Sequence, residues 1–214
     1  MKAEYVFKWM AVAQGHLKQG ANGNAAEIIE ALKQEAAAEI RREEAKRSGT
    51  ADRQKAAERV IKSAKADIYH EALHGAWMTA DGMQNLCDGF QAYRLREALP
   101  LEEIPANAQP LDIARIVITN CGGVVPLPEL SELRAHIKTE KARIKALKKS
   151  KELNPDRSAP IWDFGEELPQ VKAEYLLNAL ELLPNCTAYA KKKNEYVYLE
   201  SDAGAGVILP IRKA

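Results

Sequence analysis

Residues 170–214 read QVKAEYLLNALELLPNCTAYAKKKNEYVYLESDAGAGVILPIRKA, and this stretch decides the fold that we expect. Its leucines recur at helical spacing, which predicts an amphipathic helix at 173–183 with one face packed on a sheet. Downstream, large apolar residues alternate with small or polar ones, as in half-buried strands. The expected strands cover about 186–191, 195–201 and 206–212, with turns at Asn185, Asn194, Gly204 and Gly206.

A second β-rich stretch, LHGAWMTADGMQNLCDGFQAYRL, occupies residues 73–95. It contains the pairs Asp81-Gly82 and Asp88-Gly89. Asp-Gly is a strong hairpin signal, because both residues tolerate a positive φ. We therefore expect strands at about 73–79 and 84–95.

Strong helix formers dominate residues 1–66, with breaks near Gly20 and Gly49, and also residues 129–152. The helix expected at 129–152 carries an apolar stripe but holds eight Lys and Arg residues against four Glu, so it is locally basic. Besides the strands, the sequence therefore predicts three helices near the N-terminus and one basic helix at 129–152.

The segments between these elements complete the expected order. Several prolines follow residue 95, then an apolar strand or short helix at 111–119, a turn at Gly122-Gly123 and a strand in the IWDFG stretch that starts at Ile161. Strands follow helices twice along the chain. This order predicts an α+β fold with two related halves.

Short motifs in both β-rich stretches resemble those of bacterial DNA polymerase III beta sliding clamps. The run Tyr175-Leu176-Leu177-Asn178-Ala179-Leu180 is similar to the "YLLDAL" helix of clamps, and Val207-Ile208-Leu209-Pro210-Ile211-Arg212 is similar to their closing "VVMPxR" strand. Cys87-Asp88-Gly89-Phe90-Gln91-Ala92 stands where clamps have "TDGHRL". The chain also resembles small clamp-like proteins of phages and mobile elements. The resemblance covers roughly 56–118 and 160–212.

The resemblance implies a DNA-clamp-like domain of two helix-plus-antiparallel-sheet halves at 56–214. The N-terminal helices at 1–55 are then an extension, and about 128–153 is a helical insertion. Six such domains make a bacterial ring, so one domain implies a homo-oligomer. The implied function is that of a non-enzymatic replication accessory protein that binds double-stranded DNA, a replication protein with a short peptide motif, or both. The alternative is a clamp-fold protein interaction module that does not bind DNA.

In clamps, these two motifs line a hydrophobic groove for short peptides. Carried over, the groove candidates are Cys87, Gly89, Phe90, Gln91, Ala92, Val207, Leu209, Pro210, Ile211 and Arg212. This chain departs from the family at Cys87 (Thr in clamps), at Phe90-Gln91 (His-Arg) and at Leu209 (Met). The other interpretation is that these residues are only sheet core and sheet edge. In clamps the two motifs meet across a domain boundary, so the resemblance implies that a second copy completes the groove.

Clamps encircle DNA with helices around a basic pore, which needs phosphate contacts but no reading of bases. The DNA-contact candidates are the basic residues of 129–152, namely Arg134, Lys138, Lys141, Arg143, Lys145, Lys148, Lys149 and Lys151. A solvated helix face explains the same pattern.

His70, Glu71 and His74 form an HExxH motif, which on a helix binds zinc with the glutamate as general base. A zinc metallopeptidase is therefore the third hypothesis. Gly75 follows at once and predicts the end of a helix, and no HxxGxxH extension is present. We expect no metal and no cofactor, because the sequence also lacks a glycine-rich phosphate loop.

The amino-acid composition indicates the general class of protein. The 214 residues carry 31 Lys and Arg against 30 Asp and Glu, with 46% hydrophobic residues, as in an ordinary globular protein. No apolar run is long enough to span a bilayer, and no secretory signal is evident, so no membrane partner is expected. Three widely spaced cysteines indicate reduced thiols and a cytoplasmic location.

Overall fold

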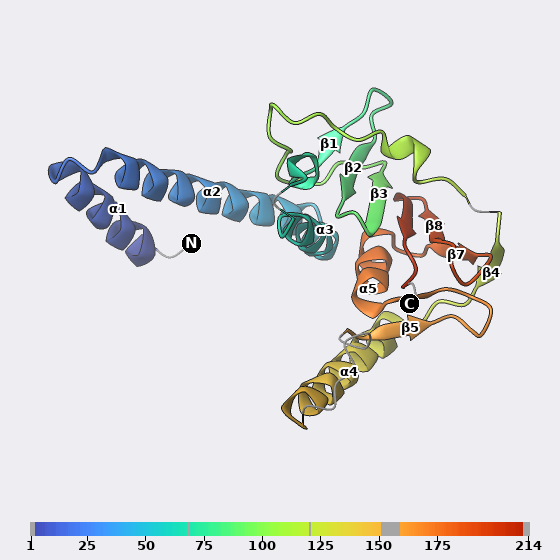
Figure 1. Cartoon of the computed structure of the whole chain (residues 1–214). Coiled ribbons are helices and arrows are strands. Elements are labelled where there is room, and N and C mark those ends of the chain that lie inside the picture. Colours follow the sequence, from blue (N-terminus) through green and yellow to red (C-terminus); the bar gives the residue numbers. More distant parts are fainter. Residues whose placement is uncertain (1–2, 68, 120, 151–158, 212–214) are drawn as a thin grey trace. The chain divides into compact units, whose positions relative to one another are not determined.

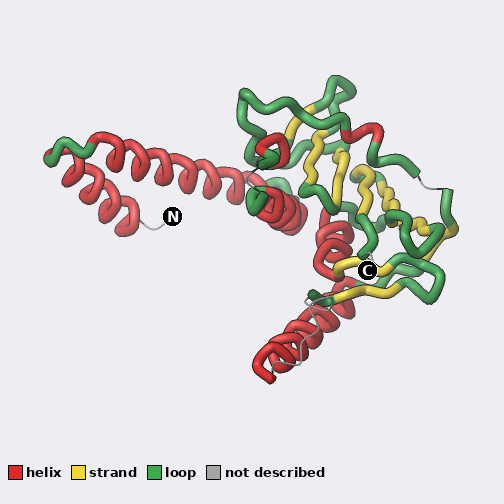
Figure 2. The backbone as a smooth tube through the Cα atoms, in the orientation of Figure 1, coloured by secondary structure: helices red, strands yellow, loops and turns green. Residues whose placement is uncertain are grey.

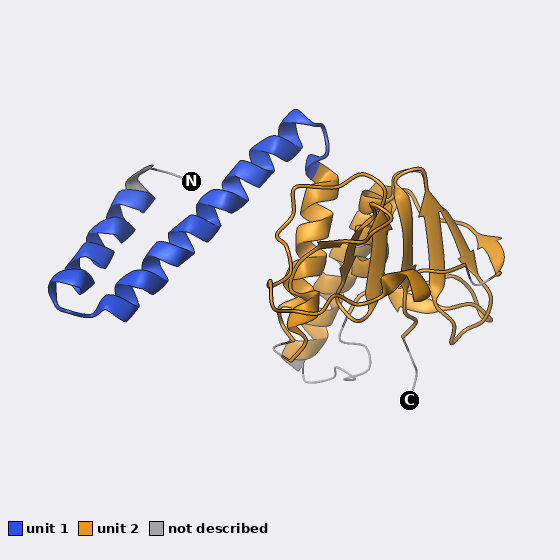
Figure 3. Cartoon of the chain, turned by 90° about the horizontal axis from the view of Figure 1, so that it is seen from above, with its two compact units in different colours: residues 1–51 blue, residues 52–214 orange. Residues whose placement is uncertain are grey.

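The computed structural model describes residues 3–67, 69–119, 121–150 and 159–211. The chain divides into two compact units, residues 1–51 and residues 52–214 (Figure 3). Within the described part of the chain, no helix is both long and apolar enough to cross a membrane.

The first unit is a pair of helices, α1 (Ala3–Lys18) and α2 (Asn22–Arg47), which pack against each other. The turn between them includes Gly20, whose φ of +75° lies in the left-handed region that favours glycine. The sequence predicted both helices and this break.

The second unit contains the remaining helices and every strand of the structure. Figure 1 follows these elements in chain order: α3 (Ala51–Ala64), β1 (Trp77–Met78), β2 (Gln84–Cys87), β3 (Gln91–Leu95), β4 (Gly123–Val125), α4 (Leu130–Ser150), β5 (Ile161–Asp163), β6 (Gln170–Lys172), α5 (Ala173–Leu182), β7 (Thr187–Ala190), β8 (Val197–Ser201) and β9 (Gly204–Ile208). Short 3₁₀ helices cover Glu71–Leu73 and Ile113–Arg115.

Seven strands form one antiparallel sheet in the order β1-β2-β3-β9-β8-β7-β4, and β5 and β6 form a separate pair (Figure 2). The orders 1-2-3 and 9-8-7 mirror each other about the central β3–β9 pair. A helix precedes each set of three strands: α3 comes before β1, and α5 comes before β7. The predicted α+β class is confirmed.

The large sheet has a core on each face. Alternate strand residues point to opposite faces, so Leu86, Tyr93 and Ile208 join the buried cluster formed with α3, α4 and α5. Their neighbours Cys87 and Val207 join the cluster on the other face, together with residues of the connector such as Ile113. Helices cover one face and the connector covers the other.

The structure differs from the expected elements in several places. The strand expected at about 73–79 is only Trp77–Met78, and Gly204 and Gly206, expected in turns, lie within β9, which ends at Ile208. The stretch 84–95 is two strands, because Asp88-Gly89-Phe90 forms a turn between them. The apolar segment at 111–119 contains a 3₁₀ helix at 113–115. Gly123, expected in a turn with Gly122, is the first residue of β4, which pairs with the distant β7. A strand of three residues defined by a partner more than sixty residues away leaves no local signal.

Candidate binding site

The turn between β2 and β3 presents Phe90 to solvent. Gly89 adopts a φ of +87°, and the Asp88 carboxylate accepts hydrogen bonds from the backbone N–H groups of Phe90 and Gln91, both at 2.9 Å. Asp88 itself is buried. The aspartate therefore fixes the turn from inside, while the Phe90 side chain stays 55% exposed.

The C-terminal run Leu209–Ile211 lies beside this turn. Gln91 pairs with Ile208 in the sheet, and beyond β9 the Leu209 N–H donates to the Phe90 carbonyl oxygen at 2.8 Å. Two residues later, the Ile211 N–H donates to the Gln170 carbonyl oxygen at 2.7 Å. The run is held at both ends, and Leu209 remains 42% exposed.

Tyr175, in the first turn of α5, completes an aromatic pair with Phe90. The two rings stack with their centroids 6.2 Å apart at an interplanar angle of 17°. The Lys172 ammonium group lies 5.4 Å from the Phe90 centroid and 5.0 Å from that of Tyr175, and it donates to the Tyr175 hydroxyl at 3.1 Å. We call Phe90, Lys172, Tyr175 and Leu209 the Phe90 patch.

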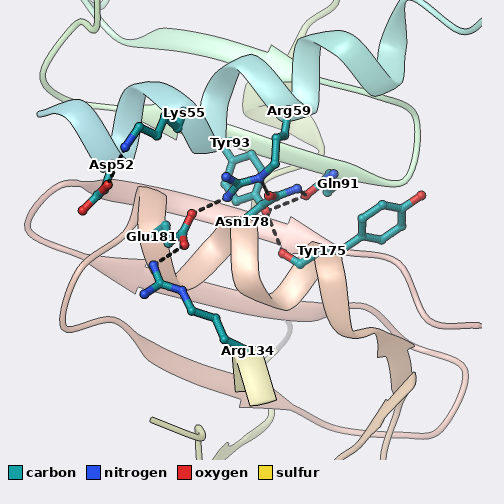
Figure 4. A network of polar contacts seen from close by, with 9 residues as sticks. All are labelled: Asp52, Lys55, Arg59, Gln91, Tyr93, Arg134, Tyr175, Asn178 and Glu181. Carbon is teal, nitrogen blue, oxygen red and sulfur yellow. Dashed lines mark hydrogen bonds and ion pairs between the residues drawn. The ribbon is translucent and has the colours of Figure 1, made fainter. Parts of the chain in front are cut away.

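A network of buried, hydrogen-bonded polar side chains supports the patch from the helix-covered side of the sheet (Figure 4). The Gln91 amide donates to Asp88 at 2.8 Å, and its oxygen accepts from the Tyr93 hydroxyl at 2.9 Å and from the Asn178 amide at 3.4 Å. Burial raises the pKa of Tyr93 well above its ordinary value, so this hydroxyl keeps its proton and can donate.

This series of hydrogen-bonded side chains continues to residues of helices α3, α4 and α5. Arg59 of α3 donates through Nε to the Asn178 side-chain oxygen at 2.8 Å, and it also pairs with Glu181. Glu181 accepts a second hydrogen bond, from Arg134 of α4, at 2.7 Å. Figure 4 shows Arg59 and Arg134 approaching Glu181 from opposite sides. These contacts join α3, α4, α5 and the β2–β3 hairpin.

The structure separates the ten groove candidates by exposure. Gly89, Phe90 and Leu209 are exposed, while Pro210 and Ile211 are half-buried. The side chains of Cys87, Gln91, Ala92 and Val207 are buried and face the two cores. Arg212 lies outside the described residues. The two motifs meet on adjacent strands of a single chain, so their contact needs no second copy.

Sequence reasoning missed two members of the patch. In the sequence, Tyr175 belongs to the helix motif, and Lys172 is the last residue of β6, directly before α5. A stack between residues 85 positions apart depends on how α5 is placed on the sheet. The sequence alone could mark Tyr175 only as the aromatic residue of the first helical turn.

The basic helix α4 is partly neutralised. Arg134 pairs with Glu181, Lys141 with Glu174 at 2.5 Å, and Arg143 with Glu140 at 2.7 Å. The other described candidates, Lys138, Lys145, Lys148 and Lys149, are exposed and have no ion pair within the described residues. Lys151 lies outside the described residues.

The HExxH residues do not lie on an α-helix. His70 and His74 flank the 3₁₀ helix at Glu71–Leu73, and both rings lie beside Asp67. His70 Nδ1 is 2.7 Å from the Asp67 carboxylate, and His74 Nε2 is 2.7 Å from the Asp67 carbonyl oxygen. Across the described parts of the chain, no group of three or more His, Cys, Asp and Glu side chains is placed to hold a metal. The arrangement lends the peptidase hypothesis no support.

No protein-family model matches this chain, and neither a curated protein nor a solved structure is significantly similar to it. The site is an exposed aromatic and aliphatic surface beside the Lys172 ammonium group, supported by hydrogen-bonded buried side chains.

Proposed function

We propose that this protein is a non-enzymatic interaction module that binds a short peptide segment of a partner at the Phe90 patch. The observation that carries the proposal is the exposed Phe90 ring, which stacks on Tyr175 beside the Lys172 ammonium group, with the exposed Leu209 joined to Phe90 by a backbone hydrogen bond. Exposed aromatic side chains beside aliphatic ones are typical anchors in protein interfaces.

The chemistry of the patch defines the peptide. Phe90 and Leu209 offer apolar contact to an aliphatic or aromatic side chain, and Lys172 offers a cation to a carboxylate next to it. The turn and the C-terminal run are already fixed by backbone hydrogen bonds, so little conformational entropy is lost on binding. The expected ligand is a segment with two apolar side chains and one acidic group.

The clamp resemblance points in the same direction. The motifs that pair here as β3 and β9 are those to which the resemblance assigns peptide binding. We extend the proposal to an accessory role in replication in a phage or mobile element, in the cytoplasm, where the three free thiols would stay reduced.

A peptide array tests the proposal. Octapeptides on a Gly-Ser background would carry one Leu-Phe pair at varied spacing and one Asp, and fluorescence anisotropy would measure their binding to the full chain. We expect a dissociation constant on the order of 0.1 mM for the best spacing, or roughly −5.5 kcal/mol. Phe90→Ser or Leu209→Ser should weaken binding at least tenfold.

Two further variants sharpen this experiment. Lys172→Met should remove the preference for Asp over Asn in the peptide while leaving the apolar contact. Ile118→Ser is the matched control, because Ile118 is an aliphatic residue of similar exposure outside the patch. The proposal fails if no peptide binds more tightly than 1 mM, or if Phe90→Ser binds as well as the control.

A second candidate function is phosphate contact with double-stranded DNA through α4. The observation that favours it is the spacing of Lys138, Lys145 and Lys148, which places three exposed lysines on one side of the helix without ion pairs in the described structure. Three phosphate contacts would make the logarithm of the binding constant fall with the logarithm of salt concentration with a slope of about −2.7.

The triple variant Lys138→Glu, Lys145→Glu and Lys148→Glu should abolish this salt-dependent affinity for a duplex oligonucleotide. Lys191→Glu, Lys192→Glu and Lys193→Glu change the net charge equally at exposed positions elsewhere and serve as the control. If both triple variants lose the same affinity for the duplex, the binding depends on overall charge alone, and α4 is not the DNA interface.

A further inference from the structure

Helix α1 is apolar on nearly every side. Six of its large apolar residues are 38% to 72% exposed, and they are Tyr5, Phe7, Trp9, Met10, Val12 and Leu17. Five of these lie within eight consecutive residues, so they cannot all face α2. A helix that is apolar all round is normally buried. Helix α2 alone leaves α1 largely uncovered.

The two helices bury very little between them. In the described part of the first unit, the buried residues are Ala13, Ala25 and Ala45, and alanine contributes little apolar area. In proteins, most of the stability of a helix comes from packing of its apolar face rather than from its intrinsic propensity. Burial of the exposed apolar side chains of α1 against a further surface would therefore stabilise the hairpin.

A groove of about 240 Å³ runs between α1 and α2. Its apolar lining comes from Tyr5, Trp9, Ile28, Ala31 and Leu32, and the Tyr5 and Trp9 rings meet edge to face with their centroids 6.2 Å apart.

Two glutamates, Glu27 and Glu35, complete the lining of this groove. Both are exposed, and neither forms an ion pair in the described structure, whereas Glu30 pairs with Lys33. They lie eight residues apart, about 12 Å along the helix axis. The occupant that matches is apolar and carries two cations at a similar separation.

We propose that the groove takes apolar side chains of α1 from a second copy of this chain. Helix α1 is apolar, and its described lysines, Lys8 and Lys18, lie ten residues apart, about 15 Å along the axis. Lysine side chains can cover the remaining difference. The lysines of each α1 then meet Glu27 and Glu35 of the other copy, and the contact is reciprocal about a two-fold axis. The product is a bundle of four helices in which each α1 packs on the α1–α2 groove of the other copy.

Charge reversal on the full-length chain tests this pairing. Sedimentation velocity and light scattering at 1–100 μM should give wild-type protein a mass of twice the 23.7 kDa chain. The variant Glu27→Lys with Glu35→Lys places lysines against Lys8 and Lys18, and it should raise the dimer dissociation constant at least tenfold. The variant Lys8→Glu with Lys18→Glu should do the same.

Mixing the two variants provides the decisive measurement. Each reversed pair then meets its complement in the other chain, so an equimolar mixture should recover the wild-type dimer. Glu43→Lys with Glu44→Lys is the matched control, because both residues lie beyond Glu35 and outside the groove lining, and this variant should stay dimeric.

Three results would overturn the proposal: a wild-type protein that has the mass of one chain at 100 μM, reversed variants that dimerise as wild type does, and a mixture that remains monomeric. The readout is mass alone, so the result is independent of peptide binding at the Phe90 patch.

Discussion

The N–H of Leu209 donates to the carbonyl oxygen of Phe90 at 2.8 Å, one residue beyond the end of β9. This bond extends the pairing of β3 with β9 and holds Leu209 next to the Phe90 turn. The two exposed apolar residues of the patch are therefore neighbours because of a backbone contact.

Replacing Leu209 with proline removes this donor. We expect Leu209→Pro to lower the free energy of unfolding by about 1–2 kcal/mol more than Leu209→Ala does, because the Phe90 carbonyl loses its partner. Urea denaturation measures both variants. Equal losses would mean that only the leucine side chain matters at this position.

Gly206 provides a steric prediction. A Cβ atom at this position would lie 2.5 Å from a ring carbon of Tyr93, which is fully buried and fixed by the polar network of the site. Gly206→Ala should therefore lower the free energy of unfolding by about 1–3 kcal/mol. Gly123→Ala, in another strand with no atom within 4 Å of the added Cβ, should change it by less than about 0.5 kcal/mol.

The ion pairs of Glu181 should be unequal in their effect on stability. Arg59 also holds the buried Asn178, whereas Arg134 contacts Glu181 from a position with 54% side-chain exposure. We expect Arg59→Ala to cost roughly 1–3 kcal/mol and Arg134→Ala less than about 1 kcal/mol. Thermal and urea unfolding of both variants give the comparison. If the Arg134 variant is the less stable one, α4 anchors the network more strongly than α3.

Cys186 should make the protein less stable at alkaline pH. Burial raises the pKa of its thiol to about 11, while the unfolded chain releases this proton near the ordinary value of about 8.5 to 9. Between these values the unfolded state binds fewer protons than the native state, so the free energy of unfolding falls as pH rises. The full loss is up to about 3 kcal/mol.

The measurement is the free energy of unfolding from pH 8 to pH 11.5, compared with Cys186→Ala. The variant should lose less stability over this window, although its stability at pH 8 is lower. Tyr198, whose pKa is raised to about 12 chiefly by burial, acts in both proteins and cancels in the comparison. Parallel curves for the two proteins would contradict the prediction.

Local patterns predicted most of the elements in the fold. The leucine spacing of α5 and the Asp-Gly turns of the β2–β3 region are short-range signals, and the structure contains these elements close to the expected bounds. Local patterns did not predict the pairing of strands that lie far apart in the sequence. Nothing near Gly123 indicates that it will face Ala190, because that contact depends on how the two halves of the sheet close.

The site was less predictable for the same reason. Motif positions identified Phe90 and Leu209, but burial decides which motif residues reach solvent, and the strand alternation sends Cys87 and Val207 into the connector-side core. The Tyr175 stack and the Lys172 cation arise from the docking of α5, which no local sequence window encodes.

The centre of the sheet has a consequence for how the chain folds. The β3–β9 pair joins residues 91–95 to residues 204–208, more than one hundred positions apart, whereas each set of three strands on either side is formed by neighbours in the sequence. Closing such a long loop costs entropy before any contact rewards it, and this slows folding. During synthesis, β3 must wait with an unpaired edge until almost the whole chain has been made.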